Sequence, residues 1–297
     1  MAMTDMPEQL GLETEPLHPM LGAAVRGLDL RKPLSPEIFA AVHTAWMAHL
    51  VLVFPDQPIS DGQKIAFARM FGELETHHQD IIKSARAPEI FRVSNVDDDG
   101  NLMQADHPIV AQISLAQRWH TDSSYRATPS MGSILHGVEV TEEGGETCFT
   151  NMYKVYKSLP DKLRQAIGDH RLRHDVSHLT TLAPIKPLSE EERAAMPPVW
   201  QPMRRRHPLT ERTSLYISPI YNDAIEGMAD EQAVDLVAEL AEFAGRLEFV
   251  YHHRWSKDDV VMWDNRYTMH RVTPYDLGEH RVMHRTTIVG DGPVIAA

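Results

Sequence analysis

The sequence predicts a mainly β fold with helical decoration, arranged as one sandwich or barrel domain. Helical patterns dominate roughly the first 70 residues, and short apolar runs separated by turn residues dominate from about residue 91 onward. Strands that follow one another in this way, with helices inserted between them, are typical of a decorated sandwich or barrel. No linker rich in Gly, Ser or Pro divides the chain. We therefore expect an N-terminal tail over 1–16 and a single catalytic domain over 17–297.

The front of the chain is predicted to hold two helices around a strand. A helix is expected over 36–49, because Ser35 suits the N-cap and the apolar residues that follow recur at three- and four-residue steps. The short apolar run 51–54 ends at a proline and predicts a buried strand. A second helix is predicted over 60–71, opened by a Ser-x-x-Gln capping box.

The rest of the chain is predicted to consist of short strands with occasional helices. The stretch 180–208 carries six prolines and many charges, which predicts a long loop or a lid. Asp230 is the expected N-cap of the last helix. Strands are predicted over 93–96, 132–140, 147–150, 247–255, 260–263 and 282–289, and helices over 160–167 and 231–244.

The charge balance excludes several classes of partner. With 42 acidic and 29 basic residues, the formal net charge is -13. Such a chain repels phosphate backbones and anionic lipids, so we expect neither nucleic acid nor membrane as a partner. A local group of arginines could still bind a small anion. The single cysteine, Cys148, and an N-terminus without a secretion-signal pattern favour a cytoplasmic protein.

Two of the seventeen histidines occur in a pattern that suits a metal. In His120-Thr121-Asp122 an imidazole and a carboxylate stand two residues apart, so on an extended segment both side chains point to the same face. A distal histidine, His270, would complete a set of two His and one carboxylate. Non-haem iron(II) oxygenases use this set, because it leaves coordination positions open. The pair alone is a weak signal, since His78-Gln79-Asp80 repeats it, and a zinc hydrolase could use the same ligand types.

Four motifs in order resemble the taurine dioxygenase and 2,4-dichlorophenoxyacetate dioxygenase family of iron(II)- and 2-oxoglutarate-dependent oxygenases. The resemblance runs from about Leu17 to Pro293 and implies a double-stranded β-helix, or jelly roll, as the core. Glu146 stands where the family has Asp. The motifs are Trp119-His120-Thr121-Asp122, Gly144-Gly145-Glu146-Thr147, Trp263-Asp264-Asn265-Arg266 through His270, and the pair Arg281 and Arg285.

The resemblance also implies roles for individual residues. His120, Asp122 and His270 correspond to the iron ligands. Thr147 and Arg281 correspond to the pair that binds the distal carboxylate of 2-oxoglutarate, the cosubstrate that is used together with dioxygen. Three further positions correspond to the substrate pocket, with Arg285 expected to meet an acidic group; these are Arg285, His77 and Tyr221.

The substrate implied by the resemblance is a small organic acid. The segment 119–125, the Met-Pro-Pro turn at 196–198 and the segment 251–255 look nearer to the aryloxyalkanoate enzymes, whereas Ala116 and Ser123 depart from the taurine enzyme. We therefore expect a carboxylate; an aryloxyalkanoate, with cleavage of its ether bond, is one candidate within this class. Sulfonates, alkyl sulfates and amino-acid-like acids stay open, as does a non-catalytic binding protein on the same scaffold. The family's habit suggests a homodimer or homotetramer.

Overall fold

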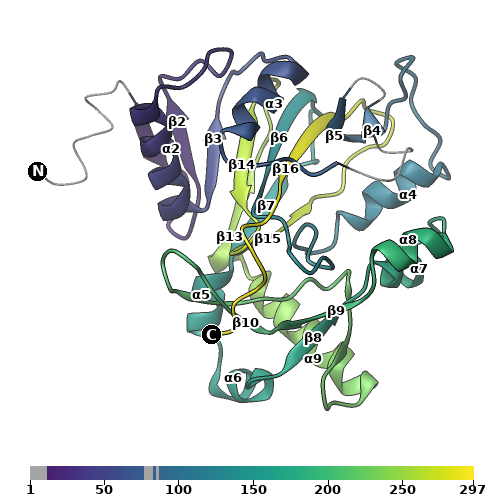
Figure 1. The fold of residues 1–297 in the computed structure, drawn as a ribbon. Coiled ribbons are helices and arrows are strands. Elements are labelled where there is room, and N and C mark those ends of the chain that lie inside the picture. Colours follow the sequence, from purple (N-terminus) through teal and green to yellow (C-terminus); the bar gives the residue numbers. More distant parts are fainter. Residues whose placement is uncertain (1–11, 77–82, 85–86) are drawn as a thin grey trace, which may run out of the picture.

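The computed structural model describes residues 12–76, 83–84 and 87–297 (Figure 1). Its larger sheet is antiparallel except for the parallel pairing of β2 with β3. The predicted mainly β architecture is therefore confirmed. The strands of this sheet, in spatial order, are β1 (Glu13–Pro16), β2 (Ala23–Arg26), β3 (Val51–Phe54), β14 (Val260–Asp264), β6 (Gly132–Glu139), β16 (Val282–Ile288), β5 (Ala87–Ser94) and β4 (Lys83–Ser84).

A smaller antiparallel sheet faces the larger one. It consists of β13 (Val250–His253), β7 (Thr147–Asn151) and β15 (Thr268–Val272), in that order. Phe149 of this sheet packs in one buried cluster with Leu135 and Trp263 of the larger sheet. Apolar contact between two sheets is the packing that a jelly roll requires. The interior surface between them is where the functional side chains gather.

Two helices cover the outer face of the larger sheet (Figure 1). Helix α2 (Pro36–His49) has Ser35 as N-cap and buries Trp46, and α3 (Asp61–Arg69) opens with the predicted capping box. Both helices are confirmed, although α3 ends at Arg69 and not at residue 71. Apolar residues recurring on one helical face bury against the sheet, which fixes these helices in place.

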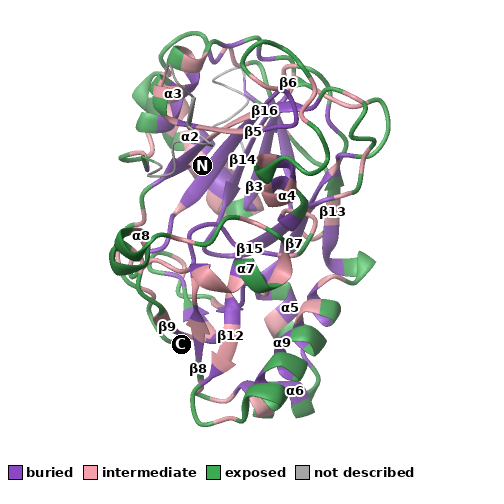
Figure 2. Ribbon diagram, turned by 90° about the vertical axis from the view of Figure 1, so that its right-hand side faces the viewer, coloured by how far each residue is buried: buried purple, intermediate pink, exposed green. Residues whose placement is uncertain are grey.

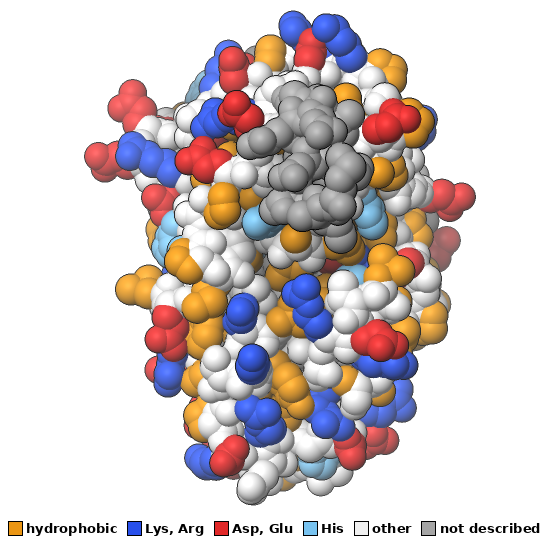
Figure 3. Space-filling view, turned by 90° about the vertical axis from the view of Figure 1, so that its left-hand side faces the viewer, with side chains coloured by type: hydrophobic (Ala, Val, Ile, Leu, Met, Phe, Trp, Pro, Cys, Tyr) orange, Lys and Arg blue, Asp and Glu red, His pale blue; other side chains and the backbone are white. Residues whose placement is uncertain are grey.

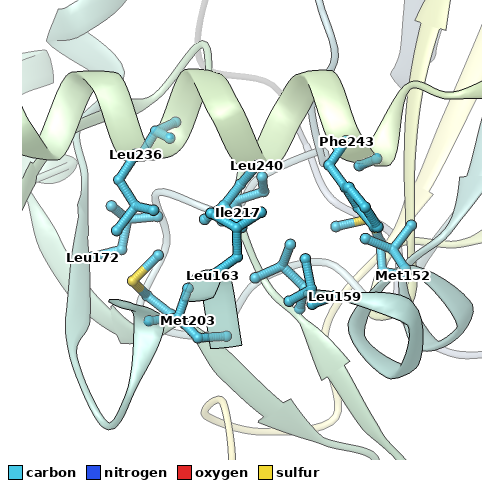
Figure 4. Packing of buried hydrophobic residues seen from close by; sticks show 14 of the residues in the cluster. Met152, Leu159, Leu163, Leu172, Met203, Ile217, Leu236, Leu240 and Phe243 are labelled. Carbon is cyan, nitrogen blue, oxygen red and sulfur yellow. The ribbon is translucent and has the colours of Figure 1, made fainter. Parts of the chain in front are cut away.

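A second lobe lies below the smaller sheet in Figure 1. Its sheet has the order β12 (Asn222–Ile225), β8 (Arg171–His174) and β9 (Val199–Pro202). Leu236, Leu240 and Phe243 project from α9 into a buried apolar cluster (Figure 4). Figure 2 shows the outward faces of its helices exposed. The helices of this lobe are α5 (Met152–Ser158), α6 (Asp161–Ile167) and α9 (Asp230–Ala244).

Several sequence-based boundaries are wrong. The stretch 180–208 is not one long loop, because Ser189 and Glu192 form a capping box that opens a helix and the following strand pairs with β8. Asp230 is the first residue of α9, and Ala229 occupies the N-cap position without a side-chain hydrogen bond. The predicted strand over 247–255 begins as a 3-10 turn, η2 (Leu247–Phe249).

Other elements shifted or were not predicted. The strand expected over 93–96 is β5, which ends at Ser94. Several elements had no predicted counterpart. Besides β1, β2, β4, β8, β9, β12, β15 and α5, they include α4 (Pro108–Leu115), η1 (Val176–His178), α7 (Leu179–Leu182), α8 (Glu190–Ala195), β10 (Arg204–Arg206) and β11 (Thr213–Leu215).

The surface is mixed in charge. Figure 3 shows acidic and basic side chains interspersed on one face of the molecule. None of the helices in the described part of the chain is both long and apolar enough to cross a lipid bilayer.

A buried ion pair joins the end of β14 to the C-terminal segment. The Arg266 guanidinium donates to both carboxylate oxygens of Asp264, at 3.0 and 2.8 Å, and to Asp291 at 2.7 Å. The side chain of Asp264 is 0% exposed, whereas that of Asp291 is 37% exposed. Arg266 therefore holds one fully buried and one half-exposed partner.

The difference in exposure between Asp264 and Asp291 predicts a difference in their contributions to stability. Asp264→Asn should lower the free energy of unfolding by about 3 kcal/mol, because it unbalances a buried pair. Asp291→Asn, the matched change on the same arginine, should cost less than about 1 kcal/mol, because water screens that pair. Urea unfolding of both variants measures the difference. Equal losses would contradict the argument from burial.

Candidate active site

Three predicted residues meet between the two sheets. His120 and His270 exchange backbone hydrogen bonds of 3.0 and 2.8 Å, which place their imidazoles beside each other. Each Nε2 lies 3.9 Å from Oδ1 of Asp122. All three side chains are buried, and their ligand atoms lie within 4.8 Å of one another. The arrangement could hold a metal ion.

The two imidazoles are prepared to act as neutral ligands. Nδ1 of His120 lies 2.9 Å from the carbonyl oxygen of Arg118, so Nδ1 carries the proton and Nε2 keeps its lone pair for the centre. Nδ1 of His270 has no hydrogen-bond partner within the described residues. Burial, as the largest cause, lowers the pKa of both rings from the ordinary value. A neutral imidazole is the form that binds a metal.

The carboxylate of Asp122 uses its two oxygens differently. Oδ1 accepts a hydrogen bond of 2.7 Å from Arg285, and Oδ2 accepts one of 2.8 Å from Ser133. Burial by itself would raise the pKa of Asp122, but the charge of Arg285, together with the hydrogen bond from Ser133, opposes it and holds that pKa below its usual range. Asp122 is therefore an ionised carboxylate whose Oδ1 faces both histidines.

A cavity opens beside these three residues. It holds about 910 Å³ of empty space, including its mouth open to solvent, and both sheets contribute to its walls. Many of the side chains that line the cavity are apolar. These include Phe91 of β5, Ile109 and Ile113 of α4, Leu179 of α7, and Ile220. This wall was not predicted from the sequence, although the proline at the first position of α4 and the spacing of its apolar residues indicate a helix.

Arg281 and Thr147 both line the cavity. Arg281 is 4% exposed and donates to the carbonyl oxygen of Gly145 at 3.0 Å, and within the described residues no carboxylate pairs with it. Burial lowers its pKa from the usual value, and the Tyr275 phenol partly offsets this. Oγ1 of Thr147 accepts a hydrogen bond of 3.0 Å from Trp255, which leaves the hydroxyl proton free to donate. A buried cation beside a free donor suits a carboxylate ligand.

The Gly144-Gly145 turn lets Arg281 reach this position. Both glycines have positive φ, at 69° and 66°. A Cβ on Gly145 would lie 3.0 Å from Nε of Arg281, and one on Gly144 would lie 2.2 Å from the carbonyl oxygen of Pro274. Only glycine accommodates both the backbone conformation and this close approach. Both glycines are therefore needed for Arg281 to take this position.

The remaining predicted pocket residues divide into three cases. Arg285 lines the cavity, lies 4.4 Å from the Phe91 ring centroid and is paired with Asp122, a partner that the sequence analysis did not anticipate. Tyr221 lines the cavity and packs edge-on against Tyr125, with centroids 4.9 Å apart. His77 lies outside the described residues.

Comparisons with known proteins agree with this geometry. The family model described as "Taurine catabolism dioxygenase TauD, TfdA family" matches residues 13–287. A 2,4-dichlorophenoxyacetate dioxygenase from Cupriavidus pinatubonensis, named as alpha-ketoglutarate-dependent, is 36% identical over 96% of this chain and 100% of its own length. An (S)-phenoxypropionate/alpha-ketoglutarate-dioxygenase from Sphingobium herbicidovorans is 31% identical over 93% of this chain and 94% of its own length.

The solved structures point the same way. A crystal structure of AAD-2 in complex with Mn(II) and N-oxalylglycine superimposes with a TM-score of 0.87 at 35% identity, covering 96% of this chain and 99% of that one. The match extends over the whole fold, and the jelly-roll prediction is confirmed. The chain therefore belongs to the TauD, TfdA family of iron(II)- and 2-oxoglutarate-dependent dioxygenases.

Proposed function

We propose that the protein hydroxylates a small aryloxyalkanoate at the carbon that bears the ether oxygen. The observation that carries this proposal is one cavity with an apolar wall and a His-Asp-His group, lined by four arginines that include Arg281 and Arg285. Of the other two, Arg92 pairs with Asp98 and Arg271 lies over the Trp119 ring. Arg281 and Arg285 suit two separate acids, the cosubstrate and the substrate, and the apolar wall suits an aromatic ring. A hydrophilic acid would leave that wall without a partner.

His120, Asp122 and His270 are the proposed iron ligands, and Arg281 with Thr147 is the proposed site for the distal carboxylate of 2-oxoglutarate. The neutral imidazoles, the ionised Asp122 and the buried Arg281, which pairs with no carboxylate among the described residues, support these roles. Iron(II), 2-oxoglutarate and dioxygen together supply the oxidising power: the keto acid becomes succinate and carbon dioxide, and the second oxygen atom is added to a substrate C–H bond.

Arg285 is the proposed anchor for the substrate carboxylate. Its Nε has no hydrogen-bond partner within the described chain, so the guanidinium can donate to an acid while it contacts Asp122. Phe91 lies against the same guanidinium and continues into the apolar wall. An acid held at this point would extend its ring along the wall and turn its α-carbon toward the centre.

Ether cleavage follows from the position of hydroxylation. A hydroxyl group on the carbon that carries the aryl ether oxygen makes a hemiketal or hemiacetal. This product collapses when the hydroxyl proton leaves and the C–O bond to the ring breaks, which releases a phenol and a 2-oxo acid. The protein's contribution is orientation and exclusion of water around the reacting carbon.

The same chemistry on a sulfonate, an alkyl sulfate or an amino-acid-like acid is the second candidate, since Arg285 would bind any such anion. The cytoplasmic location and the dimeric or tetrameric state stay predictions. Gel filtration combined with light scattering would measure the oligomeric state directly.

A spectroscopic experiment tests the metal centre. Anaerobic addition of Fe(II) and 2-oxoglutarate should produce a weak visible charge-transfer band in the wild-type protein. Asp122→Ala should abolish the band, because the carboxylate ligand is lost. Asp80→Ala, which removes the carboxylate of the other His-x-Asp pair, is the matched control and should keep it. Folded wild-type protein without the band, or an unchanged band in Asp122→Ala, would refute the assignment.

Steady-state kinetics separate the two arginines. Arg281→Gln should raise the KM for 2-oxoglutarate about 10- to 100-fold, because it removes charge-assisted hydrogen bonds worth roughly 1.5–3 kcal/mol. Arg285→Gln, assayed at saturating iron, should instead raise the KM for the acid substrate. If each change affected the other compound, the two proposed roles would have to be exchanged.

A substrate panel tests the proposed class. Aryloxyacetates and 2-aryloxypropionates should give phenol and succinate in equal amounts, and the corresponding amides should give neither above background, because Arg285 needs an anion. Alkyl sulfonates and alkyl sulfates form the competing arm. Faster succinate formation with that arm than with any aryloxyalkanoate would favour the second candidate.

A further inference from the structure

A second layer of polar side chains surrounds the Asp122 carboxylate on the side away from the histidines. Ser133 of β6 donates to Oδ2 of Asp122 at 2.8 Å, and Ser130 donates to the backbone carbonyl of Asp122 at 3.2 Å. Nδ2 of Asn265 lies 2.9 Å from Oγ of Ser133 and 3.0 Å from Oγ of Ser130. Both serines are 0% exposed and Asn265 is 1% exposed, so these groups are shielded from bulk solvent.

The direction of every hydrogen bond in this group is determined. An ionised carboxylate only accepts, so the single hydroxyl proton of Ser133 must point to Asp122. Ser133 can then only accept from Asn265, which must turn its NH2 group toward the serines. The amide oxygen of Asn265, Oδ1, accepts a hydrogen bond of 2.7 Å from Nε1 of Trp263, a group that can only donate. The amide orientation is therefore fixed from both ends.

We propose that Ser133, held by Asn265, is a positioning residue that keeps Asp122 a ligand through one oxygen only. While Ser133 occupies Oδ2, that oxygen is directed away from the centre and Oδ1 alone faces the histidines. Released from Ser133, the carboxylate could rotate about its Cβ–Cγ bond, and Oδ1 would no longer be held toward both histidines. The three-residue site would then lose a fixed ligand atom, which would weaken metal binding and, with it, the binding of 2-oxoglutarate. This inference rests on the proposed role of Asp122 as an iron ligand.

Ser130 provides a matched control within the same group. Like Ser133 it is a fully buried serine that accepts from Nδ2 of Asn265. It differs in one respect, because its own proton goes to a backbone carbonyl and not to the carboxylate. Ser130→Ala therefore removes an equivalent buried hydroxyl without touching Oδ2.

Isothermal titration calorimetry, with Mn(II) alone as the probe, measures metal binding. Ser133→Ala should weaken Mn(II) binding by roughly tenfold or more, the effect of losing an outer partner of a ligand. Ser130→Ala should stay within about twofold of the wild type. Anaerobic titration of the Fe(II) forms with 2-oxoglutarate should likewise show weaker cosubstrate binding in Ser133→Ala only. The thermal midpoints of the two metal-free variants should be similar, because both lose one buried hydroxyl.

The outcomes separate this inference from the proposed function. Wild-type protein that binds no Mn(II) would overturn both. Wild-type binding together with equal affinities in Ser133→Ala and Ser130→Ala would overturn the role of Ser133 and leave the iron site standing. Asn265→Ala addresses the same question should Ser133→Ala fail to fold, because it removes the donor that orients the Ser133 hydroxyl. Wild-type Mn(II) affinity in folded Asn265→Ala would overturn the inference as well.

Discussion

Two backbone hydrogen bonds between His120 and His270 hold the active site together. The segment that carries His120 and Asp122 belongs to no strand of either sheet, and these bonds attach it to β15. Two further hydrogen bonds reinforce this attachment. The backbone N–H of Val272 donates to the carbonyl oxygen of Ala116, and the Thr121 hydroxyl donates to the carbonyl oxygen of Thr268. Because a backbone pairing fixes the positions of both Cα atoms, the two imidazoles meet without depending on flexible contacts.

Several arginines lie inside the protein, and they differ in whether a carboxylate pairs with them. Arg266 is matched by Asp264 and Asp291, and Arg285 is matched by Asp122. Within the described residues, Arg281 has no such counter-ion, although it is as deeply buried as the others. An uncompensated buried charge is costly, and Arg281 lines the cavity, so an anion that enters the cavity would compensate it. Arg205, which is also buried without a carboxylate partner among the described residues, lies instead over the rings of Tyr216 and Tyr267.

The sequence predicts the residues of the proposed site better than it predicts the contacts around them. The proposed metal and cosubstrate residues stand in short motifs, where residue type and spacing carry the information. The pairing of Arg285 with Asp122 could not be predicted, since it joins residues 163 positions apart and depends on how the strands align. The contact of Asn265 with Ser133, 132 positions apart, is hidden for the same reason.

The error over 180–208 has a different origin. Prolines and charges indicated irregular structure, and the Ser189-x-x-Glu192 capping box was overlooked although it was present in the sequence. The strand β9 in that region is stabilised by pairing with β8, a tertiary contact that outweighs local composition. Helix α4, which supplies Ile109 and Ile113 to the cavity, was missed because its run is short.

The hydrogen bond from Trp255 to Thr147 affects which ligands this end of the cavity would bind. Because the indole N–H takes one of the two acceptor positions of the hydroxyl, the Thr147 proton remains for an incoming group. The Arg281 guanidinium can only donate. An ionised carboxylate would accept from both groups, whereas the NH2 group of a neutral amide would oppose the guanidinium. We therefore expect this end of the cavity to favour an ionised acid over its neutral amide, although the two have nearly the same shape.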